Sequence, residues 1–188
     1  MLDSFNRVGA SMSRAGDELL PLLARFTFAA VLLMYFWQSG MTKLGDGFFG
    51  FLSPSLGAYA QIFPKAMESV GYDVSQLTFF HTIVVLAGTW AEFILPLFIV
   101  IGLLTRLSAL GMIGFIVVQS LTDLYAHGGL ADPKVFGGWF DAASDALILD
   151  QRTLWVMVLL VLVFKGAGSL SVDRALNGML GHPADAQR

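Results

Sequence analysis

The chain has 188 residues, of which 56% are hydrophobic and only 13% are charged, and its mean hydropathy is +0.71. Soluble domains carry about 25% charged residues, so this composition indicates an integral membrane protein. The net charge of −3, with no long Lys/Arg block, argues against nucleic-acid binding. The sequence has no cysteine, which excludes disulfide exchange, thiolate metal sites, iron–sulfur clusters and covalently attached haem.

The first 40 residues predict two kinds of helix. Residues 1–18 are mixed in polarity, with Phe5, Val8 and Met12 at helical spacing, and we expect an amphipathic helix at the membrane interface. Residues 19–40 contain a single charge, Arg25, and are predicted to form the first membrane-spanning helix, since about 20 apolar residues cross a bilayer.

Residues 41–78 are rich in glycine and phenylalanine and predict a folded extramembrane segment with a short helix near 55–69. Spans at 79–104 and 105–125 follow, joined by a hinge at 102–106 that is too short to cross a bilayer. They should therefore form an antiparallel hairpin. After a second long loop at 126–152, the fourth span is placed at about 150–168. Its apolar run is short, so we expect the helix to begin earlier, near Asp141.

These elements predict an all-α fold: a four-helix transmembrane bundle with two long extracytoplasmic loops, an N-terminal interfacial helix and a cytoplasmic tail at 171–188. Orientation follows from the distribution of Lys and Arg. The side with both termini and the hinge carries Arg7, Arg14, Arg106, Lys165, Arg174 and Arg188, with Arg25 nearby; the other side carries Lys43, Lys65, Lys134 and Arg152. We therefore expect both termini in the cytoplasm and both long loops on the outside.

Glu92 is the main candidate for a functional residue, because a carboxylate in the middle of an apolar span is costly to bury without a partner. At 100° per residue it shares a face with His81 and Gly88. Pro96 removes the hydrogen bond to the Glu92 carbonyl and should kink the helix there. The sequence leaves open whether Glu92 is catalytic or belongs to an ion pair that locks the bundle.

Arg25 and Arg106 are the cations considered for Glu92. Arg25 lies about 9 Å from the cytoplasmic end of the first span, and Glu92 lies about 18 Å from the cytoplasmic end of the second. A long arginine side chain with a bridging water could close most of this difference, so we expect Arg25 to pair with Glu92. Arg106 is interpreted mainly as a positive-inside anchor at the hinge. Lys43 shares a face with Arg25; it could contact a polar head group or a partner, but snorkelling towards the membrane surface is the simpler interpretation.

Polar residues of the third span and two histidines complete the candidates. Gln119 shares a helix face with Phe115 and Asp123, and interhelical hydrogen bonding is the favoured interpretation, except that Asp123 is expected to be solvated. His81 and His127 are each 23 residues from Leu104, so a hairpin should place them at similar depth. Two imidazoles could bind a b-type haem, copper or zinc, but interfacial hydrogen bonding is the usual role of such histidines.

Three stretches carry a resemblance to a known family. They are LLPLLARFTFAAVLLMYFWQSGMTKL, WAEFILPLFIVIGLLTRLSAL with Glu92 and the hinge, and the closing KGAGSLSVDRAL. Over residues 20–176 the chain resembles the DoxX family of bacterial membrane proteins. Ala167 stands where the family's usual Gly-Pro-Gly ending has proline. The long loops suggest a specialised subgroup.

The resemblance implies a small membrane subunit linked to quinone-dependent sulfur oxidation or to thiol and redox stress, and it makes Glu92, Arg25 and Arg106 the residues to test. We therefore expect a redox accessory that binds a quinone-like amphiphile and serves a partner oxidoreductase or a periplasmic protein. The alternatives are a non-catalytic anchor or assembly factor, and a metal-handling or small-solute transport accessory. The oligomeric state, including a homo-oligomer, stays open.

Overall fold

The computed structural model describes residues 2–179, and this part of the chain is helical without a β-strand. Four of its helical stretches are long and apolar enough to cross a membrane: Phe5–Met41, Phe79–Ile101, Thr105–Ala126 and Leu147–Lys165. The predicted all-α class with four spans is confirmed. Residues of the predicted tail beyond Met179, including His182 and Arg188, lie outside the described residues.

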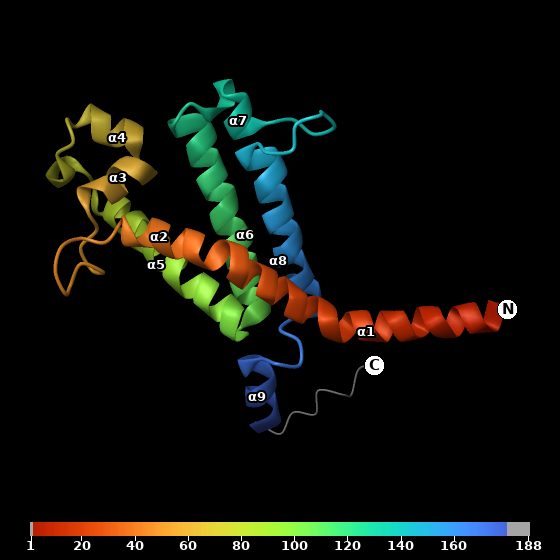
Figure 1. The fold of residues 1–188 in the computed structure, drawn as a ribbon. Coiled ribbons are helices and arrows are strands. Elements are labelled where there is room, and N and C mark those ends of the chain that lie inside the picture. The colour runs from red at the N-terminus through yellow and green to blue at the C-terminus, as the bar shows by residue number, and fades with distance from the viewer. Residues whose placement is uncertain (1, 180–188) are drawn as a thin grey trace.

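The first span is one continuous helix made of α1 (Leu2–Phe28), the π-helical η1 (Ala29–Leu33) and α2 (Met34–Met41). The boundary expected between an interfacial helix and a span at residue 19 is not marked by a break. Forty residues at 1.5 Å each make a helix about 60 Å long, twice the thickness of a bilayer core. The N-terminal half of α1 accordingly projects away from the bundle (Figure 1) and exposes Phe5, Val8 and Met12.

The four spans pack in a ring. The first span lies against α5 (Phe79–Ile101), α5 against α6 (Thr105–Leu121), α6 against α8 (Thr153–Lys165), and α8 against α1. Their shared core is centred on Phe28, Phe36, Met112 and Leu162, all of them fully buried. In Figure 1, α2 and α5 run side by side at a steep angle to α6 and α8, so the two pairs diverge away from the hinge.

The hairpin between α5 and α6 is confirmed, and three residues form its turn. Gly102 (φ +73°) and Leu104 (φ +46°) are both left-handed, a conformation that costs little for glycine and more for leucine. Asp173, at the start of α9 (Val172–Met179), accepts hydrogen bonds from the Leu104 and Thr105 amides at 2.7 and 2.9 Å. The C-terminal segment therefore caps α6 and holds the turn.

The fourth span begins with the π-helical η5 (Leu147–Arg152) and continues as α8. The helix therefore starts before its apolar run, as expected, but at Leu147, so the predicted start near Asp141 is wrong. Residues 141–146 are bends and irregular backbone, and the Asp150 carboxylate accepts a hydrogen bond from the Ala146 amide just ahead of the helix.

The extramembrane segments lie at the ends of the spans opposite the hinge. The helix expected near 55–69 is two helices, α3 (Leu56–Ile62) and α4 (Pro64–Ser69), because proline at 64 cannot continue α3. A second small core of Ala58, Tyr59, Met67 and Val85 holds them on α5. The 3-10 turns η2 (Val74–Gln76) and η4 (Gly129–Ala131) and the short α7 (Pro133–Phe136) complete these segments, with the π-helical η3 (Thr122–Ala126) extending α6.

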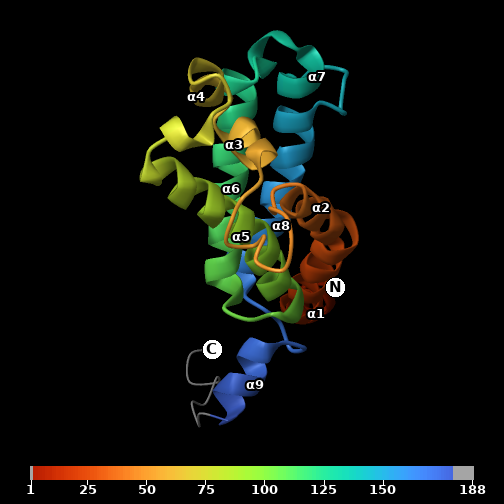
Figure 2. The same cartoon turned by 90° about the vertical axis from the view of Figure 1, so that its left-hand side faces the viewer.

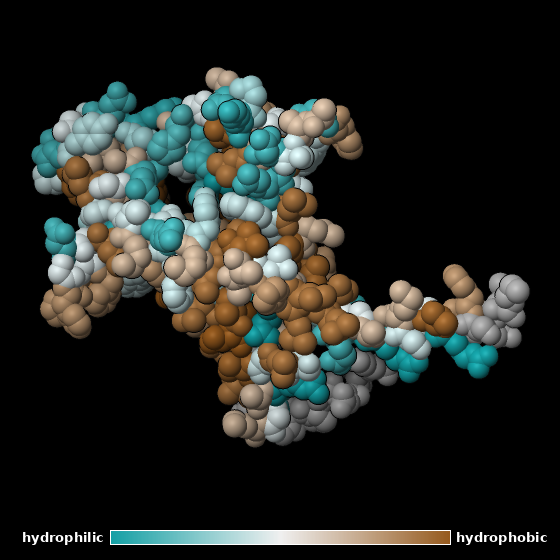
Figure 3. Space-filling model, in the orientation of Figure 1, coloured by the Kyte–Doolittle hydropathy of each residue, from teal (hydrophilic) through white to brown (hydrophobic). Residues whose placement is uncertain are grey.

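The surface follows the same division. Apolar side chains gather over the middle of the bundle, and polar ones gather over the extramembrane helices (Figure 3). Many large apolar side chains of the spans are exposed, including Leu110, Val117 and Leu154. This distribution suits a lipid environment around the middle of the bundle.

Candidate functional site

A buried polar cluster of three residues lies between α2 and α5. Glu92 is 1% exposed and Lys43 is 6% exposed. The Lys43 Nζ lies 3.0 Å from each Glu92 carboxylate oxygen and also donates to the Ser39 hydroxyl (2.7 Å) and the Ser39 carbonyl (3.2 Å). The Ser39 hydroxyl in turn donates to Glu92 Oε1 at 2.9 Å. The two opposite charges are thus paired and hydrogen-bonded, which is the condition for burying them.

The cluster forms because α2 ends beside the middle of α5. Gly40 makes the close contact possible: a Cβ at this position would lie 2.7 Å from the Phe93 ring. Trp37 Nε1 donates to the Phe93 carbonyl at 3.3 Å. Lys43, in the turn after α2, therefore lies at the depth of Glu92 rather than at the end of α5.

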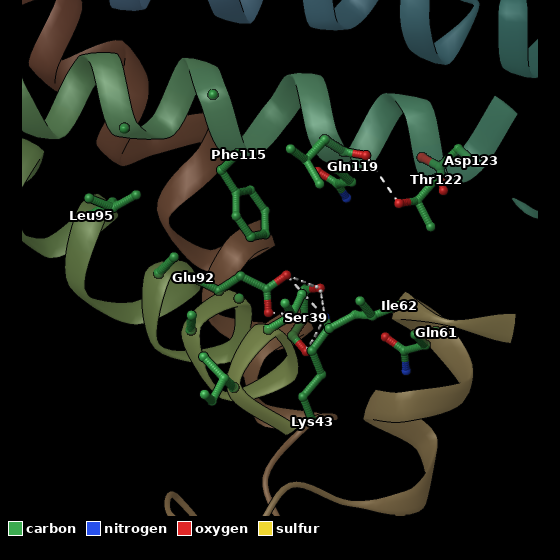
Figure 4. A pocket seen from close by; sticks show the side chains of 18 of the residues that line it. Ser39, Lys43, Gln61, Ile62, Glu92, Leu95, Phe115, Gln119, Thr122 and Asp123 are labelled. Atoms are coloured by element: carbon green, nitrogen blue, oxygen red, sulfur yellow. Dashed lines mark hydrogen bonds and ion pairs between the residues drawn. The ribbon is translucent and has the colours of Figure 1, made fainter. Parts of the chain in front are cut away.

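A cavity of about 520 Å³ lies between α5 and α6 and reaches this cluster. Its size falls within the range of ligand pockets, roughly 300–1,000 Å³. It is lined by Ser39, Lys43, Gln61, Ile62, Ile83, Val84, Ala87, Gly88, Ala91, Glu92, Leu95, Gly111, Gly114, Phe115, Val118, Gln119, Thr122, Asp123 and His127. Figure 4 shows the Glu92 carboxylate and the Phe115 ring entering the same space from α5 and α6.

The cavity is closed at one end and bridged at the other. Towards the hinge, α5 and α6 meet where Gly111 packs on Leu95, with a Cβ at Gly111 falling 3.2 Å from the leucine. Towards the extramembrane side, His127 Nε2 forms a hydrogen bond with the Gln61 carbonyl at 3.0 Å and links the end of α6 to α3. At Gly114, an exposed residue of the lining, a Cβ would meet no atom within 4 Å, so the cavity is open at this position.

Gln119 projects from α6 into this cavity. Its Nε2 donates to the Tyr35 hydroxyl at 3.3 Å, which confirms the predicted interhelical hydrogen bond. Its Oε1 is buried and is without a hydrogen-bond partner among the described residues. An unpaired buried carbonyl is costly, so this atom marks a position where a ligand would be stabilised.

The predicted pairing of Arg25 with Glu92 is wrong. The Arg25 guanidinium instead donates to backbone carbonyls: Ile99 at 3.1 Å, Val100 at 2.6 Å, Ala167 at 2.9 Å and Leu170. These carbonyls lie at the C-terminal end of α5 and in the turn after α8, where helices leave acceptors unsatisfied. Arg25 therefore fastens the hinge end of the bundle, while Lys43, expected to snorkel outwards, is the partner of Glu92.

Arg106 lies at the same end of the molecule and is exposed, in keeping with an anchor at the membrane surface. Its guanidinium lies beside Gly166, where a Cβ would be 3.4 Å from the arginine Nε. The hinge and the closing Gly-x-Gly-x-Leu-Ser-x-Asp segment, which carry much of the resemblance in the sequence, are thus neighbours in space. The segment after α8 therefore packs against the hinge end of the bundle, where it contacts Arg25 and Arg106 and contributes Asp173.

A second ion pair, partly buried, joins η3 at the end of α6 to η5 at the start of the fourth span, near the extramembrane side. Arg152, 3% exposed, lies 2.6 Å from Asp123 and donates to the Ser120 hydroxyl at 2.9 Å. The expectation that Asp123 is simply solvated is wrong, because Arg152, far from it in the sequence, is its ion-pair partner. Asp123 also borders the cavity.

The two histidines have separate surroundings. His81 Nδ1 contacts the Thr78 hydroxyl at 2.8 Å and its ring packs edge-on against Phe63, whereas His127 bonds to Gln61. Within residues 2–179 there is no group of three or more His, Cys, Asp or Glu side chains that could hold a metal ion. Both histidines make the interfacial hydrogen bonds that the sequence favoured.

Ser39 is the site residue that the sequence analysis missed. The available signal was its spacing: it precedes Lys43 by four residues, so the two share a helix face. The pairing of Lys43 with Glu92 was missed for another reason. A residue count from the helix ends gives the correct depth only where those ends are level, and α2 is staggered against α5.

These features define a class: a multi-pass all-α membrane protein with a buried lysine–glutamate pair at the wall of a mainly apolar cavity. The family profile for DoxX matches residues 20–128, more than half of the chain, and the protein belongs to the DoxX family. Comparisons with curated proteins and with solved structures gave no significant match.

Proposed function

We propose that this DoxX-family protein binds a quinone-like amphiphile in the cavity between α5 and α6 and serves a partner oxidoreductase in sulfur, thiol or stress metabolism. The observation that carries the proposal is the buried Lys43–Ser39–Glu92 cluster at the wall of an otherwise apolar cavity. Quinone chemistry couples electrons to protons, and a carboxylate inside an apolar pocket can exchange protons with a ring oxygen. Phe115 offers an aromatic surface for the ring.

The roles proposed for the site residues differ from those that the sequence alone predicts. Glu92 is the proposed proton-exchanging group, Lys43 is its ion-pair partner, and Gln119 faces the same ligand from α6. Arg25 and Arg106 lie at the hinge and are not proposed to touch the ligand. A membrane partner would accept or supply the electrons, because the chain lacks cysteine and its histidines make interfacial hydrogen bonds.

Binding is tested by titrating a short-chain ubiquinone analogue into the detergent-purified protein and following its tryptophan fluorescence. We expect saturable quenching. Gly114→Phe should weaken binding at least about tenfold, because its ring would fill open space in the cavity. Leu110→Phe is the matched control, since Leu110 lies on the exposed side of the same helix. Equal quenching of all three proteins would contradict the proposal.

A non-catalytic anchor or assembly factor is the second candidate. The observation in its favour is that Lys43, Ser39 and Glu92 satisfy one another without a ligand. The partner pathway's activity separates the two. A stable Glu92→Gln variant that retains full pathway activity supports the anchor, and a stable variant that loses activity supports quinone binding.

A further inference from the structure

The hydrogen-bonding groups of the α5–α6 cavity are not evenly divided between donors and acceptors. Lys43 is its only ammonium among the described residues, and its three protons are already shared by four acceptors: both Glu92 oxygens, the Ser39 hydroxyl and the Ser39 carbonyl. The lysine therefore has no proton left for a ligand while this geometry persists. The Ser39 hydroxyl is used in the same way, because it donates to Glu92 Oε1.

Most of the unused capacity deep in the cavity belongs to acceptors, although the Gln119 Nε2, which donates one of its two protons to Tyr35, keeps one N–H. Glu92 Oε2 receives one hydrogen bond, from Lys43, and an ionised carboxylate oxygen can accept two. Gln119 Oε1 is buried and receives none. Glu92 comes from α5 and Gln119 from α6, and Figure 4 shows both extending towards the space beside Phe115. A ligand between them thus meets acceptors on two sides of the cavity.

Most of the polar groups nearer the opening are occupied as well. The Thr122 hydroxyl donates to the Val118 carbonyl at 3.1 Å, the Asp123 carboxylate is paired with Arg152, and His127 is bonded to the Gln61 carbonyl. The described lining near the opening keeps one further amide donor, Gln61 Nε2, which lies 3.5 Å from the Thr42 hydroxyl.

From this division we infer that the cavity recognises the reduced, dihydroxy form of an aromatic amphiphile, a hydroquinone, in preference to the oxidised quinone. The inference rests on the proposed function. A hydroquinone carries two phenolic donors that can bond to Glu92 Oε2 and Gln119 Oε1. A quinone presents only carbonyl acceptors, so it would oppose the Glu92 carboxylate with an acceptor and leave Gln119 Oε1 unpaired. Leaving a buried acceptor unpaired, or opposing two acceptors, is unfavourable, so the reduced form is bound more tightly.

The test uses three ligands of nearly one shape: a short-chain benzoquinone, its hydroquinone kept reduced under anaerobic conditions, and the dimethyl ether of that hydroquinone, which has no donor. Their affinities for the full-length protein in detergent are compared by titration. We expect the hydroquinone to bind about tenfold or more tightly than either of the others, as one charge-assisted hydrogen bond is sufficient for such a factor.

Variants assign the preference to particular atoms. Gln119→Leu should lose most of the preference, because it removes the unpaired acceptor Oε1. Tyr35→Phe removes the Nε2 partner of Gln119 and should keep the preference. Thr122→Val is the matched control from the same helix, because its hydroxyl is already bound to the Val118 carbonyl. These replacements leave the Lys43–Glu92 pair intact, so folding of the bundle is preserved.

The outcomes separate the two proposals. If none of the three ligands binds, the proposed function fails and the inference fails with it. If all bind but the quinone or the dimethyl ether binds as tightly as the hydroquinone, the cavity is a quinone site without the inferred preference. The inference is also overturned if the Gln119→Leu protein keeps the full preference for the hydroquinone.

Discussion

At the scale of single residues, the decisive feature is the mutual dependence of Lys43 and Glu92. Each is nearly inaccessible, and each supplies the charge that makes burial of the other tolerable. Removing one partner of a buried pair leaves an isolated charge, which costs more than replacing both. The pair therefore predicts a strongly non-additive response to substitution, and this response is independent of any ligand.

Lys43→Met should lower the free energy of unfolding by about 3 kcal/mol, because Glu92 would be left buried without its cation. Lys43→Met with Glu92→Leu should recover most of this loss, to within about 1 kcal/mol of the parent protein. The measurement is unfolding in mixed micelles followed by circular dichroism. Lys65→Met, on the exposed surface of α4, is the control and should change little. Additive effects of the two substitutions would contradict a coupled pair.

The individual residues show where sequence reasoning reached its limit. The sequence identified Glu92 as the exceptional charge, since a carboxylate in an apolar span is recognisable without a structure. It assigned the wrong cation, because Arg25 and Lys43 share a helix face and differ only in their distance from Glu92 along the bundle. That distance depends on how α2 slides along α5, which is fixed by the contact of Gly40 with Phe93.

At the scale of elements, the end of the bundle near the hinge is held by backbone groups rather than by apolar packing alone. Arg25 satisfies carbonyls from α5 and from the segment after α8, and Asp173 satisfies amides at the start of α6. The sequence predicted the hairpin from the length of its hinge. It did not predict the hydrogen bonds from Arg25 and Asp173 to the backbone, because such bonds leave no pattern in the residue types.

Asp173→Ala should lower the free energy of unfolding by about 1–2 kcal/mol, because it leaves the Leu104 and Thr105 amides without their acceptor. Asp173→Asn retains one acceptor oxygen and should lose less. Asp46→Ala, in an exposed loop, serves as the control and should change stability by under about 0.5 kcal/mol. The same circular dichroism assay measures all three, and an Asp173→Ala protein as stable as the control would show that the cap is unimportant.

The helix starts and ends were predictable only in part. The proline at position 64 begins α4, so residues 55–69 form two helices where the sequence analysis expects one. The start of the fourth span could not be read from apolar composition, because η5 contains Asp150 and Arg152. Arg152 is accommodated there by Asp123 of η3 and Ser120 of α6, and such long-range contacts are invisible to local periodicity.

At the scale of the whole molecule, the cavity lies where the α2–α5 pair diverges from the α6–α8 pair, and Gln61 and Ile62 of α3 complete its lining. In Figure 2, α3 lies in front of α6. A second, mainly apolar cavity of about 500 Å³ lies between the first span and α8, lined by Phe28, Tyr35, Trp155 and their neighbours. A charged side chain is absent from the described lining of that cavity. The two cavities therefore make a natural comparison within one protein.

Orientation in the membrane is also a property of the whole chain. We propose that the hinge and both termini face the cytoplasm, since Lys and Arg favour that side. The sequence has no cysteine, so single cysteines can report sidedness without background. Lys65→Cys in intact cells should react with an impermeant maleimide, and Asn177→Cys should react only after the membrane is opened. The reverse pattern would overturn the orientation.

The most direct measurement of the central claim is photolabelling of the protein in lipid nanodiscs with a short-chain azidoquinone in its hydroquinone form, followed by peptide mass spectrometry. The α5–α6 cavity predicts labels on residues 83–95 and 111–122, and their loss in Gly114→Phe or with excess unlabelled hydroquinone. Labels concentrated around Leu154 and Val158 in the second cavity, or spread over lipid-facing residues without competition, would contradict the account.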